Sequence, residues 1–577
     1  MQGSTGGVCL AGRLAALAEA RNGRGRGPDF VACAVLVLLW VAVWFPRFHG
    51  PIDLRWDASV YYILGTSLFE GKGYRLLNEP GEVEAVQYPP LLPLIVAAHE
   101  KALGTADYLV VAPRLRLLYF LLSGLYLAAT YVLARELLTP PFALVVSFLT
   151  ALSFDSYLHP SDTLYSEMPF ALLSALFLIC HRRSHRTGYA VATGFLGAAA
   201  YLLRTAGAAL LVAWVGESLL RRRFRQAAIR GLVAALPILL WQSHVWRVTA
   251  AEDYQRPAYP YQRAAYYYSN VSYGVNSQLV DPFRPELGRI GLRDLPKRVL
   301  GNLAAVPGAL GQSCWMGPAS PDWFREKARR WLGLELPPYE VFARALVLVG
   351  CGIIVGAVLL ARRGEWFLPL YLAATICLVS LTPWPEQFWR YLAPLTPLTA
   401  LFLVHALLVI RALPGRWDKT WGRAAGSFVL MAPLAIMLIA SAGVASSFLR
   451  HLFPVSYYDA RGNELRSRLL TYGPEWHALD PTFEWLRHRS GSDDVIASTV
   501  PHLAYLRSGH RAVLPPMEAD PELARRLLDS VPVKYVVLDQ FGISERYAAP
   551  AVRGHPSEWQ LVYTAPGGRA EVYERLR

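Results

Sequence analysis

The sequence predicts an all-α polytopic membrane protein that carries a small α/β domain at its C-terminus, and three observations support this fold class. Of the 577 residues, 54% are hydrophobic and only 17% are charged, whereas soluble domains typically carry ~25% charged residues. Apolar runs recur along the chain as far as residue 444, with basic residues gathered between them. After residue 447 the composition changes to that of a soluble domain.

The apolar runs between residues 29 and 447 predict about eleven transmembrane helices. A spanning helix needs about 20 mainly apolar residues. Several runs are shorter, so we expect flanking aromatic and small residues to complete them. In residues 190–220 we expect a pair of helices broken near Arg204, because this charge interrupts an apolar stretch.

The formal net charge of +14 could indicate a nucleic-acid partner, but the distribution of the basic residues argues against that class. Arginines cluster in alternate loops, for example at residues 182–186 and 221–225, whereas residues 155–167 contain no lysine or arginine. This is the positive-inside pattern of proteins embedded in a lipid bilayer. It predicts an integral plasma (inner) membrane protein with a cytoplasmic tail at residues 1–28 and its C-terminal domain, residues 448–577, outside.

Two long outer loops are expected, at residues 46–113 and 247–339. In the first loop we predict two short helices lying in the membrane interface, Ala58–Glu70 and Leu91–Leu103, because glycines that suit helix ends follow both. The second loop is rich in Tyr and Pro. Its aromatic residues fit either an interfacial belt or a lid that stacks on a sugar ring.

The C-terminal domain alternates helix-like and strand-like stretches, which predicts a small α/β unit. No catalytic motif occurs in it. The expected helices are Pro481–Arg487 and Pro521–Leu528, and the expected strands are Val495–Thr499, Val533–Asp539 and a hairpin of Trp559–Thr564 with Ala570–Tyr573.

Asp57 is the leading candidate for chemistry, because it lies in the first outer loop just beyond the membrane edge. A polytopic protein has little structural need for a carboxylate there. As a general base it would take the proton from a hydroxyl or amine that attacks an anomeric carbon, and a positioned base contributes about 10²–10⁴-fold. The alternative is an exposed carboxylate paired with Arg55.

Two further carboxylates, Glu167 and Asp162, lie in the next outer loop on the same predicted side. One of them could position the second substrate, or hold a divalent cation together with Asp57, because hard cations take oxygen ligands. Glu167 could equally stabilise the N-terminus of a helix. The sequence leaves these alternatives open.

Arg204 and Arg390 are among the few basic residues near the membrane on the outer side. Arginine suits bidentate phosphate binding, so both are expected to bind an anionic phosphate group. The alternatives are a snorkelling side chain or a carboxylate pair, for which Glu386 is the nearest partner of Arg390. Lys72 is a weaker candidate of the same kind.

Several motifs occur in a fixed order along the predicted outer face: Asp57 with Tyr61-Tyr62, Gly71-Lys72-Gly73-Tyr74, Tyr88-Pro89-Pro90-Leu91, the segment from Tyr165 to Phe170, and the segment from Arg390 to Leu395. In these motifs residues 30–445 resemble the C-type glycosyltransferases that use polyprenyl-phosphate sugars. The resemblance is to the bacterial relatives of protein O-mannosyltransferases and to the aminoarabinose transferases of lipid A. Protein mannosyltransferases carry Asp-Glu at the first site, whereas here Ala58 follows Asp57, which leaves a protein acceptor open.

The resemblance implies inverting transfer of a sugar from a polyprenyl-monophosphate carrier to an extracytoplasmic acceptor, which could be a lipid, a polysaccharide or a protein. Asp57 would be the base, Glu167 would assist it, and the C-terminal domain could select the acceptor. No cofactor is certain, and a divalent cation is one alternative. The residues expected to bind substrate are Arg390, Arg204, Tyr88, Lys72, Tyr62, Asp162 and Arg55.

Two rival classes remain. A transporter or flippase of a lipid-linked or sugar substrate would also be polytopic, but transporters tend to show internal repeats, and none is found in this sequence. A membrane anchor that presents the C-terminal domain as a binding module would need only one span.

Overall fold

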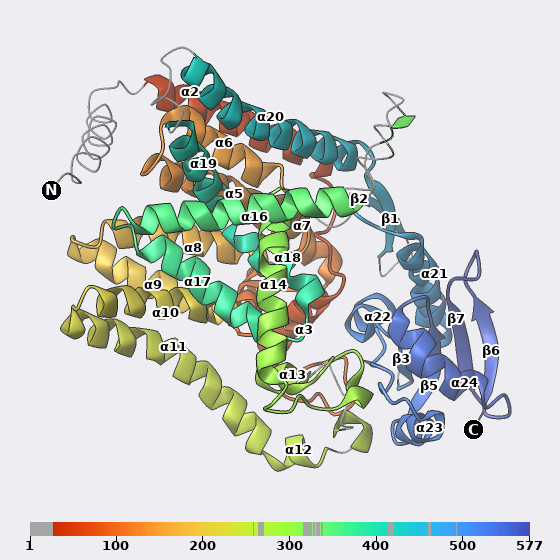
Figure 1. Cartoon of the computed structure of the whole chain (residues 1–577). Coiled ribbons are helices and arrows are strands. Elements are labelled where there is room, and N and C mark those ends of the chain that lie inside the picture. The colour runs from red at the N-terminus through yellow and green to blue at the C-terminus, as the bar shows by residue number, and fades with distance from the viewer. Residues whose placement is uncertain are drawn as a thin grey trace.

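The computed structural model shows a helical bundle joined to a smaller mixed domain at the C-terminus (Figure 1). The predicted cytoplasmic tail, residues 1–28, lies almost wholly outside the described residues. The structure describes residues 27–257, 259–263, 270–315, 326, 329–330, 335, 339–412, 421–459, 463–491 and 493–576.

Within these residues, six helices are long and apolar enough to cross a membrane. A seventh crossing is formed if α6 and the segment after it, which are bent by 72°, make one broken span. The six candidates comprise α2 (Gly27–Trp44) with η1 (Phe45–Arg47), α5 (Tyr108–Arg135), α11 (Phe224–Ala250), α16 (Tyr339–Ala361), the run from η6 (Pro385–Gln387) through α18 (Phe388–Leu392) and η7 (Ala393–Leu395) to α19 (Thr396–Ala412), and α20 (Trp421–Arg450). The broken pair is α6 (Pro140–Ala151) with η2 (Phe154–Leu158) and α7 (His159–Asp162).

The bundle also contains shorter helices that fall below the usual spanning length: α8 (Glu167–Arg182), α9 (Thr187–Leu203), α10 (Gly207–Leu220) and α17 (Phe367–Ser380). The predicted break near Arg204 is confirmed, because α9 ends at Leu203 and Arg204 has extended backbone angles. The number of about eleven spans stays a prediction.

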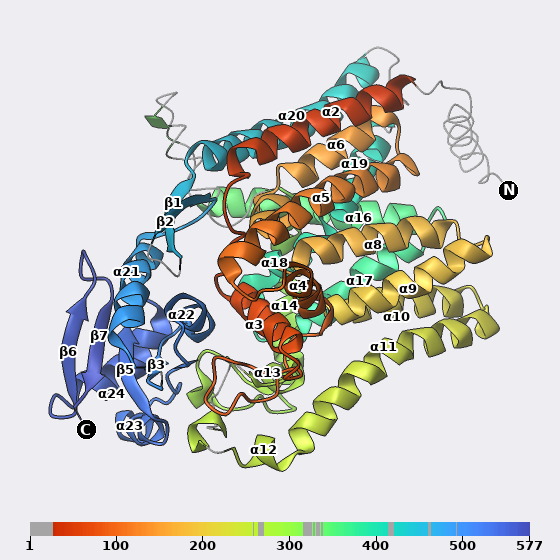
Figure 2. The ribbon, with the colours of Figure 1, turned by 180° about the vertical axis from the view of Figure 1, so that it is seen from behind.

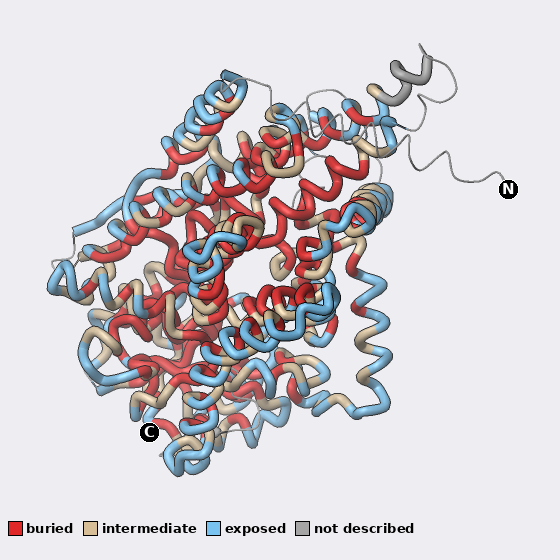
Figure 3. The backbone as a smooth tube through the Cα atoms, turned by 90° about the vertical axis from the view of Figure 1, so that its left-hand side faces the viewer, coloured by how far each residue is buried: buried red, intermediate tan, exposed pale blue. Residues whose placement is uncertain are grey.

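Exposed apolar side chains cover the outer helices of the bundle. Leu232 on α11 and Phe428 on α20 are 76% and 73% exposed, and these two helices lie at opposite edges of the bundle in both ribbon views (Figures 1 and 2). Buried residues fill the interior, as the tube in Figure 3 shows. Apolar residues that face outward in such numbers are expected where hydrocarbon replaces water around a protein.

Both predicted helices of the first outer loop are confirmed, as α3 (Asp57–Phe69) and α4 (Leu91–Leu103). They pack directly on each other, and a Cβ atom at Gly65 would lie only 2.6 Å from Val96. Gly104 ends α4 in the left-handed region at φ 67°, as expected for a glycine at a helix C-terminus. This helix pair sets the direction in which the first residue of α3 points.

The second outer loop contributes α12 (Glu252–Gln255), η3 (Pro260–Arg263), α13 (Tyr273–Gln278), η5 (Pro285–Leu287) and α14 (Leu295–Cys314). Tyr266, Tyr267 and Tyr268, which belong to the tyrosine-rich part of this loop, lie outside the described residues.

The α/β nature of the C-terminal domain is confirmed. Its five-stranded sheet has the order β4-β3-β5-β7-β6, with β3, β4 and β5 parallel and the predicted β6–β7 hairpin antiparallel. The strands are β3 (Val495–Ala497), β4 (Ala512–Val513), β5 (Val533–Leu538), β6 (Trp559–Thr564) and β7 (Glu571–Arg575), and the helices are α21 (Pro474–Arg489), α22 (Pro501–Ser508), α23 (Pro521–Asp529), η9 (Ser544–Ala548) and α24 (Ala549–Arg553).

The first helix of this domain begins earlier than the predicted start at Pro481. It begins at Pro474, because proline suits the first position of a helix, and it continues through Pro481. The sequence reading also missed an antiparallel strand pair, β1 (Phe453–Tyr458) with β2 (Glu464–Leu469), which connects the bundle to the domain (Figure 2).

Candidate active site

Two carboxylates stand at the N-termini of two different helices and approach a common point. Asp57 is the first residue of α3, and Glu167 is the first residue of α8. The partial positive charge of a helix N-terminus stabilises an ionised carboxylate. The local fold therefore places a favourable partial charge beside both side chains.

Arg390 on α18 bridges these two carboxylates. Its Nη2 donates to Oδ2 of Asp57 at 2.9 Å, and its Nε donates to Oε1 of Glu167 at 2.8 Å. The guanidinium carbon lies 4.9 Å from the centre of the Tyr165 ring. Glu386, the partner that sequence proximity offered, is not the residue that binds it.

A second guanidinium, that of Arg204 at the break between α9 and α10, completes the charge balance. Its Nη1 lies 3.1 Å from Oε2 of Glu167 and donates to Oγ of Ser166 at 3.0 Å. Glu167 therefore binds both arginines, and its side chain is only 4% exposed. Two negative and two positive charges offset one another at the centre of this site, the Asp57–Arg390–Glu167–Arg204 cluster.

Tyrosines surround the remaining oxygen of Asp57. Tyr88 donates its hydroxyl to Oδ1 of Asp57 at 3.0 Å. The Tyr88 ring lies 5.0 Å from that of Tyr61 and 6.2 Å from that of Tyr273, measured between ring centres. Tyr273 belongs to α13, so the second outer loop contributes an aromatic side chain next to the cluster, as a lid would.

The resemblance pointed to Tyr62, but the structure places its neighbour Tyr61 at the cluster. The Tyr61 hydroxyl lies 3.2 Å from Oγ of Ser166, whereas Tyr62 donates to the carbonyl of Ala106 at 2.9 Å. Burial raises the pKa of Tyr61, and the nearby charges of Asp57 and Glu167 raise it further, which keeps this hydroxyl neutral. The sequence could have indicated Tyr61, because it lies four residues after Asp57 and residues four apart share a face of a helix.

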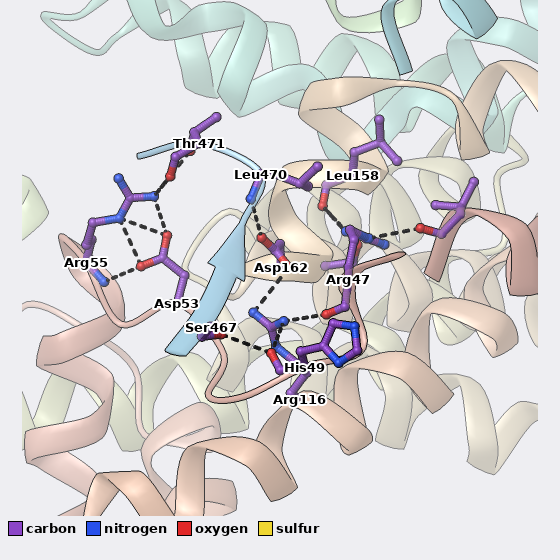
Figure 4. Close-up of polar contacts among 12 residues, drawn as sticks. Arg47, His49, Asp53, Arg55, Arg116, Leu158, Asp162, Ser467, Leu470 and Thr471 are labelled. Atoms are coloured by element: carbon purple, nitrogen blue, oxygen red, sulfur yellow. Dashed lines mark hydrogen bonds and ion pairs between the residues drawn. The ribbon is translucent and has the colours of Figure 1, made fainter. Parts of the chain in front are cut away.

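Arg55 and Asp162, which we expected at the same site, lie in a separate group of contacts (Figure 4). Arg55 pairs with Asp53 at 2.6 Å and also donates to the backbone carbonyl of Thr471. Asp162 lies 3.3 Å from Arg116 and accepts the backbone N–H of Leu470 at 3.0 Å. These two side chains are buried and join the outer loops to the C-terminal domain, and a role for them in substrate binding stays a prediction.

Lys72 also lies outside the cluster. Its ammonium group binds Glu70 and Glu82, each at 3.1 Å, on an exposed part of the first outer loop. Of the nine residues predicted for the site, the structure brings together Asp57, Glu167, Arg390, Arg204 and Tyr88, and it leaves Lys72, Tyr62, Asp162 and Arg55 elsewhere.

A divalent cation held by Asp57 with Glu167 or Asp162 stays a prediction. In the structure Asp162 binds Arg116 rather than joining Asp57, and Asp57 and Glu167 both bind arginine side chains. Within the part of the chain that the structure describes, no group of three His, Cys, Asp or Glu side chains could hold a metal ion.

The C-terminal domain borders the exposed side of Asp57, which sequence reasoning did not show. Trp56 is 47% exposed, and its ring lies 5.0 Å from that of Trp476 and 5.1 Å from that of Phe541. His502 on α22 is buried in the field of Asp57. Burial lowers the pKa of His502 to about 4, although the Asp57 charge acts in the opposite direction, so this imidazole is neutral at pH 7.

No protein-family model matches the sequence, and no curated protein matches it either. Solved structures do match its fold. The archaeal oligosaccharyltransferase AglB from Archaeoglobus fulgidus, in complex with an inhibitory peptide and a dolichol-phosphate, gives a TM-score of 0.52 at 13% identity over 95% of this chain and 74% of that one. An oligosaccharyltransferase from Archaeoglobus fulgidus in complex with Zn and sulfate gives 0.52 at 12% identity over 94% and 73%.

ArnT from Cupriavidus metallidurans bound to undecaprenyl phosphate gives a TM-score of 0.46 at 14% identity, over 95% of this chain and 98% of that one. A likeness of this size supports no further conclusion. The two oligosaccharyltransferase structures carry the comparison, and they confirm the fold that the sequence motifs predicted. The chain therefore has the fold of the C-type membrane glycosyltransferases.

Proposed function

We propose that the protein is an inverting glycosyltransferase that moves a sugar from a polyprenyl-monophosphate carrier to an acceptor outside the plasma membrane. The observation that carries this proposal is the bridge that Arg390 forms between Asp57 and Glu167. This bridge joins Asp57, a carboxylate that can act as a base, to Arg390, a guanidinium that can bind phosphate, in a chain with the fold of an oligosaccharyltransferase. The AglB structure of that fold contains a lipid phosphate, dolichol-phosphate, which supports the donor class.

Asp57 is the base in this proposal, because its carboxylate is the open side of the cluster. Its side chain is 33% exposed, against 4% for Glu167. Inversion requires the acceptor oxygen or nitrogen to attack the anomeric carbon from the side opposite the phosphate. As that bond forms, Asp57 takes the acceptor proton, a contribution of about 10²–10⁴-fold. Tyr88 and Arg390 hold the carboxylate in one orientation.

The two arginines are suited to the departing polyprenyl phosphate. Within the described residues, Nη1 of Arg390 and Nη2 of Arg204 make no hydrogen bond, so each guanidinium keeps donors for a phosphate oxygen. A phosphate is a stable anion and needs no general acid. Donors placed where negative charge develops stabilise the transition state, and Glu167 positions both guanidinium groups for this task.

The proposed orientation places the N-terminus in the cytoplasm, and the cluster and the C-terminal domain on the outer side. The aromatic rings of Trp56, Trp476 and Phe541 then border the route by which an acceptor reaches Asp57. We propose that the C-terminal domain takes part in selecting this acceptor. The acceptor class stays open between a lipid, a polysaccharide and a protein.

The test uses purified full-length protein in detergent, a panel of polyprenyl-monophosphate sugars and a crude envelope extract as acceptor. Free polyprenyl phosphate is measured by mass spectrometry for the wild type and for Asp57→Asn. We expect release to fall by about 10²-fold or more in Asp57→Asn, with an unchanged melting temperature. Glu70→Gln is the matched control, because this carboxylate lies in the same loop and binds only Lys72 among the described residues.

Activity of Asp57→Asn within a few fold of the wild type would refute the role of this residue as a base. If the folded wild-type protein releases no phosphate from any donor, the transporter or flippase class becomes the better reading. In that case transport of labelled lipid-linked sugar by the protein in vesicles should be detectable.

A further inference from the structure

A second polar site lies at the end of the bundle opposite Asp57. It is a cavity of about 250 Å³ between the last turn of α8, the turn from α10 to α11, and the start of α17. Residues Glu167 and Arg182 mark the two ends of α8, so the cavity and the cluster are separated by about 22 Å along that helix. Figure 1 shows these helix ends on the side of the bundle away from the C-terminal domain.

Positive charge exceeds negative charge in the lining of this cavity. Four arginines, Arg182, Arg221, Arg223 and Arg230, face two glutamates, Glu217 and Glu365. Much of this charge is already paired within the protein: Arg182 binds Glu365 and also Glu136, which lies outside the lining, and Glu217 binds both Arg221 and Arg230.

One charged group of the lining is left for a ligand. The side chain of Arg223 makes no hydrogen bond or ion pair to any described residue, and it is exposed. His181 is more than nine-tenths buried, and its Nε2 lies 2.8 Å from Glu217, so this histidine belongs to the paired part of the lining.

The size and the walls of the cavity restrict the ligand. Sites for drug-sized molecules usually measure about 300–1,000 Å³, so 250 Å³ suits a small head group rather than a whole sugar-lipid. Phe367 and Leu368 add an apolar side to the basic lining. Basic pockets between transmembrane helices on the face with positive loops can bind anionic lipid head groups.

We propose that this cavity is a phosphate-binding site, distinct from the Asp57 cluster, that takes the phosphate of an anionic lipid in the leaflet opposite the active site. Arg223 and Arg221 bind the phosphate oxygens. The apolar lining beside them accommodates the start of the lipid chain. Free inorganic phosphate shares the same chemistry and is the second source that the experiment distinguishes.

The test measures binding to the full-length protein in detergent by native mass spectrometry, with phosphatidic acid as the probe and phosphatidylcholine as its zwitterionic counterpart. We expect bound phosphatidic acid and a loss of affinity of about fivefold in Arg223→Gln, as for one arginine at a membrane surface. Arg225→Gln is the matched control, because Arg225 is exposed on the same turn but does not line the cavity. It should change the affinity little.

A parallel titration with inorganic phosphate, followed by calorimetry, separates the two sources. Lipid binding that depends on Arg223, without binding of inorganic phosphate, supports a lipid head group. Binding of inorganic phosphate that depends on Arg223 supports a soluble phosphate instead. Equal losses in Arg223→Gln and Arg225→Gln, or no preference for phosphatidic acid over phosphatidylcholine, would overturn the proposal, because the attraction would then be a general surface effect.

Discussion

Asp53 and Asp57 lie four residues apart in the same outer loop, and each carboxylate binds an arginine, but the two pairs differ in their surroundings. The side chains of Asp53 and Arg55 are 5% and 8% exposed, whereas those of Asp57 and Arg390 are 33% and 27% exposed. The first pair is closed in by the C-terminal domain. The second is open on one side, and its arginine is shared with Glu167. A closed pair fastens two parts of the chain, whereas an open pair can also contact a substrate.

The largest effect on stability is expected when the closed group of contacts is broken. Asp162→Ala leaves Arg116 buried and unpaired and removes the acceptor for the Leu470 N–H. Breaking a buried pair in this way costs about 3–5 kcal/mol. Thermal unfolding in detergent should show the loss, and limited proteolysis should cleave between the bundle and the C-terminal domain.

Asp493→Ala, at an exposed turn, serves as the control for this variant. An Asp162→Ala protein that melts like the wild type would show that the closed contacts do not fasten the domain.

The open pair should respond in rate rather than in stability. Arg390→Gln removes the bridge between Asp57 and Glu167, and the loss of a donor that stabilises developing charge costs about 10²–10³-fold in kcat. Arg390→Lys should recover only part of this rate, because an ammonium group cannot bind both carboxylates in the same fork. Release of polyprenyl phosphate and the melting temperature are measured on the same samples.

Arg363→Gln, at the opposite end of the bundle, is the matched control. Should Arg390→Gln retain a rate close to the wild type, the open pair would be structural like the closed one.

The stability of the protein should depend on pH through His502, which lies where the C-terminal domain borders Asp57. Burial lowers the pKa of His502 from 6.5 to about 4. Between these two pH values the imidazole is therefore protonated in the unfolded state and neutral in the folded state. The contribution to stability is complete above pH 6.5 and is lost as the pH falls from there toward 4. Between pH 7 and pH 5 the loss is about 2 kcal/mol.

The free energy of unfolding of the full chain is therefore measured at pH 5, 6 and 7 for the wild type and for His502→Gln. The difference in slope between the two proteins isolates this residue from other titrating groups. Identical slopes would mean that His502 is not held neutral at the boundary of the domain.

The smallest effect is expected at Lys72, the cation of the same loop that lies outside both groups. Its pairs with Glu70 and Glu82 are exposed, and such pairs contribute about 0–1 kcal/mol. Lys72→Gln should leave both the melting temperature and the release of polyprenyl phosphate nearly unchanged. A loss of about tenfold in rate, equivalent to ~1.4 kcal/mol, would instead show that Lys72 takes part in binding the sugar donor.

The elements of the fold that local signals determine could be predicted. Glycines mark the ends of α3 and α4, and a lone arginine marks the break after α9. Five of the nine predicted site residues lie together in the cluster, and four of them were chosen because arginines and carboxylates beside a membrane are costly unless they have a role. The β1–β2 pair was missed, since each strand is stabilised by the other rather than by its own sequence.

The partner of each charge could not be predicted in the same way. Arg55 and Asp57 are separated only by Trp56, yet they bind different residues, because Trp56 has a φ of 54° and the backbone turns there. A tryptophan gives no sequence signal for that conformation, which usually belongs to glycine. Asp162 was expected near Asp57 because both lie in loops on the same side of the membrane. Its partners come from α5 and from the segment after β2, which are far from it in the sequence.

The shared guanidinium of Arg390 also connects the two substrates. A guanidinium has five N–H groups, and among the described residues Arg390 donates to Asp57 and Glu167 only from Nη2 and Nε. A donor phosphate that binds the other N–H groups leaves both carboxylates in place. The distance between the base and the leaving phosphate would then be set by the width of one rigid, planar side chain.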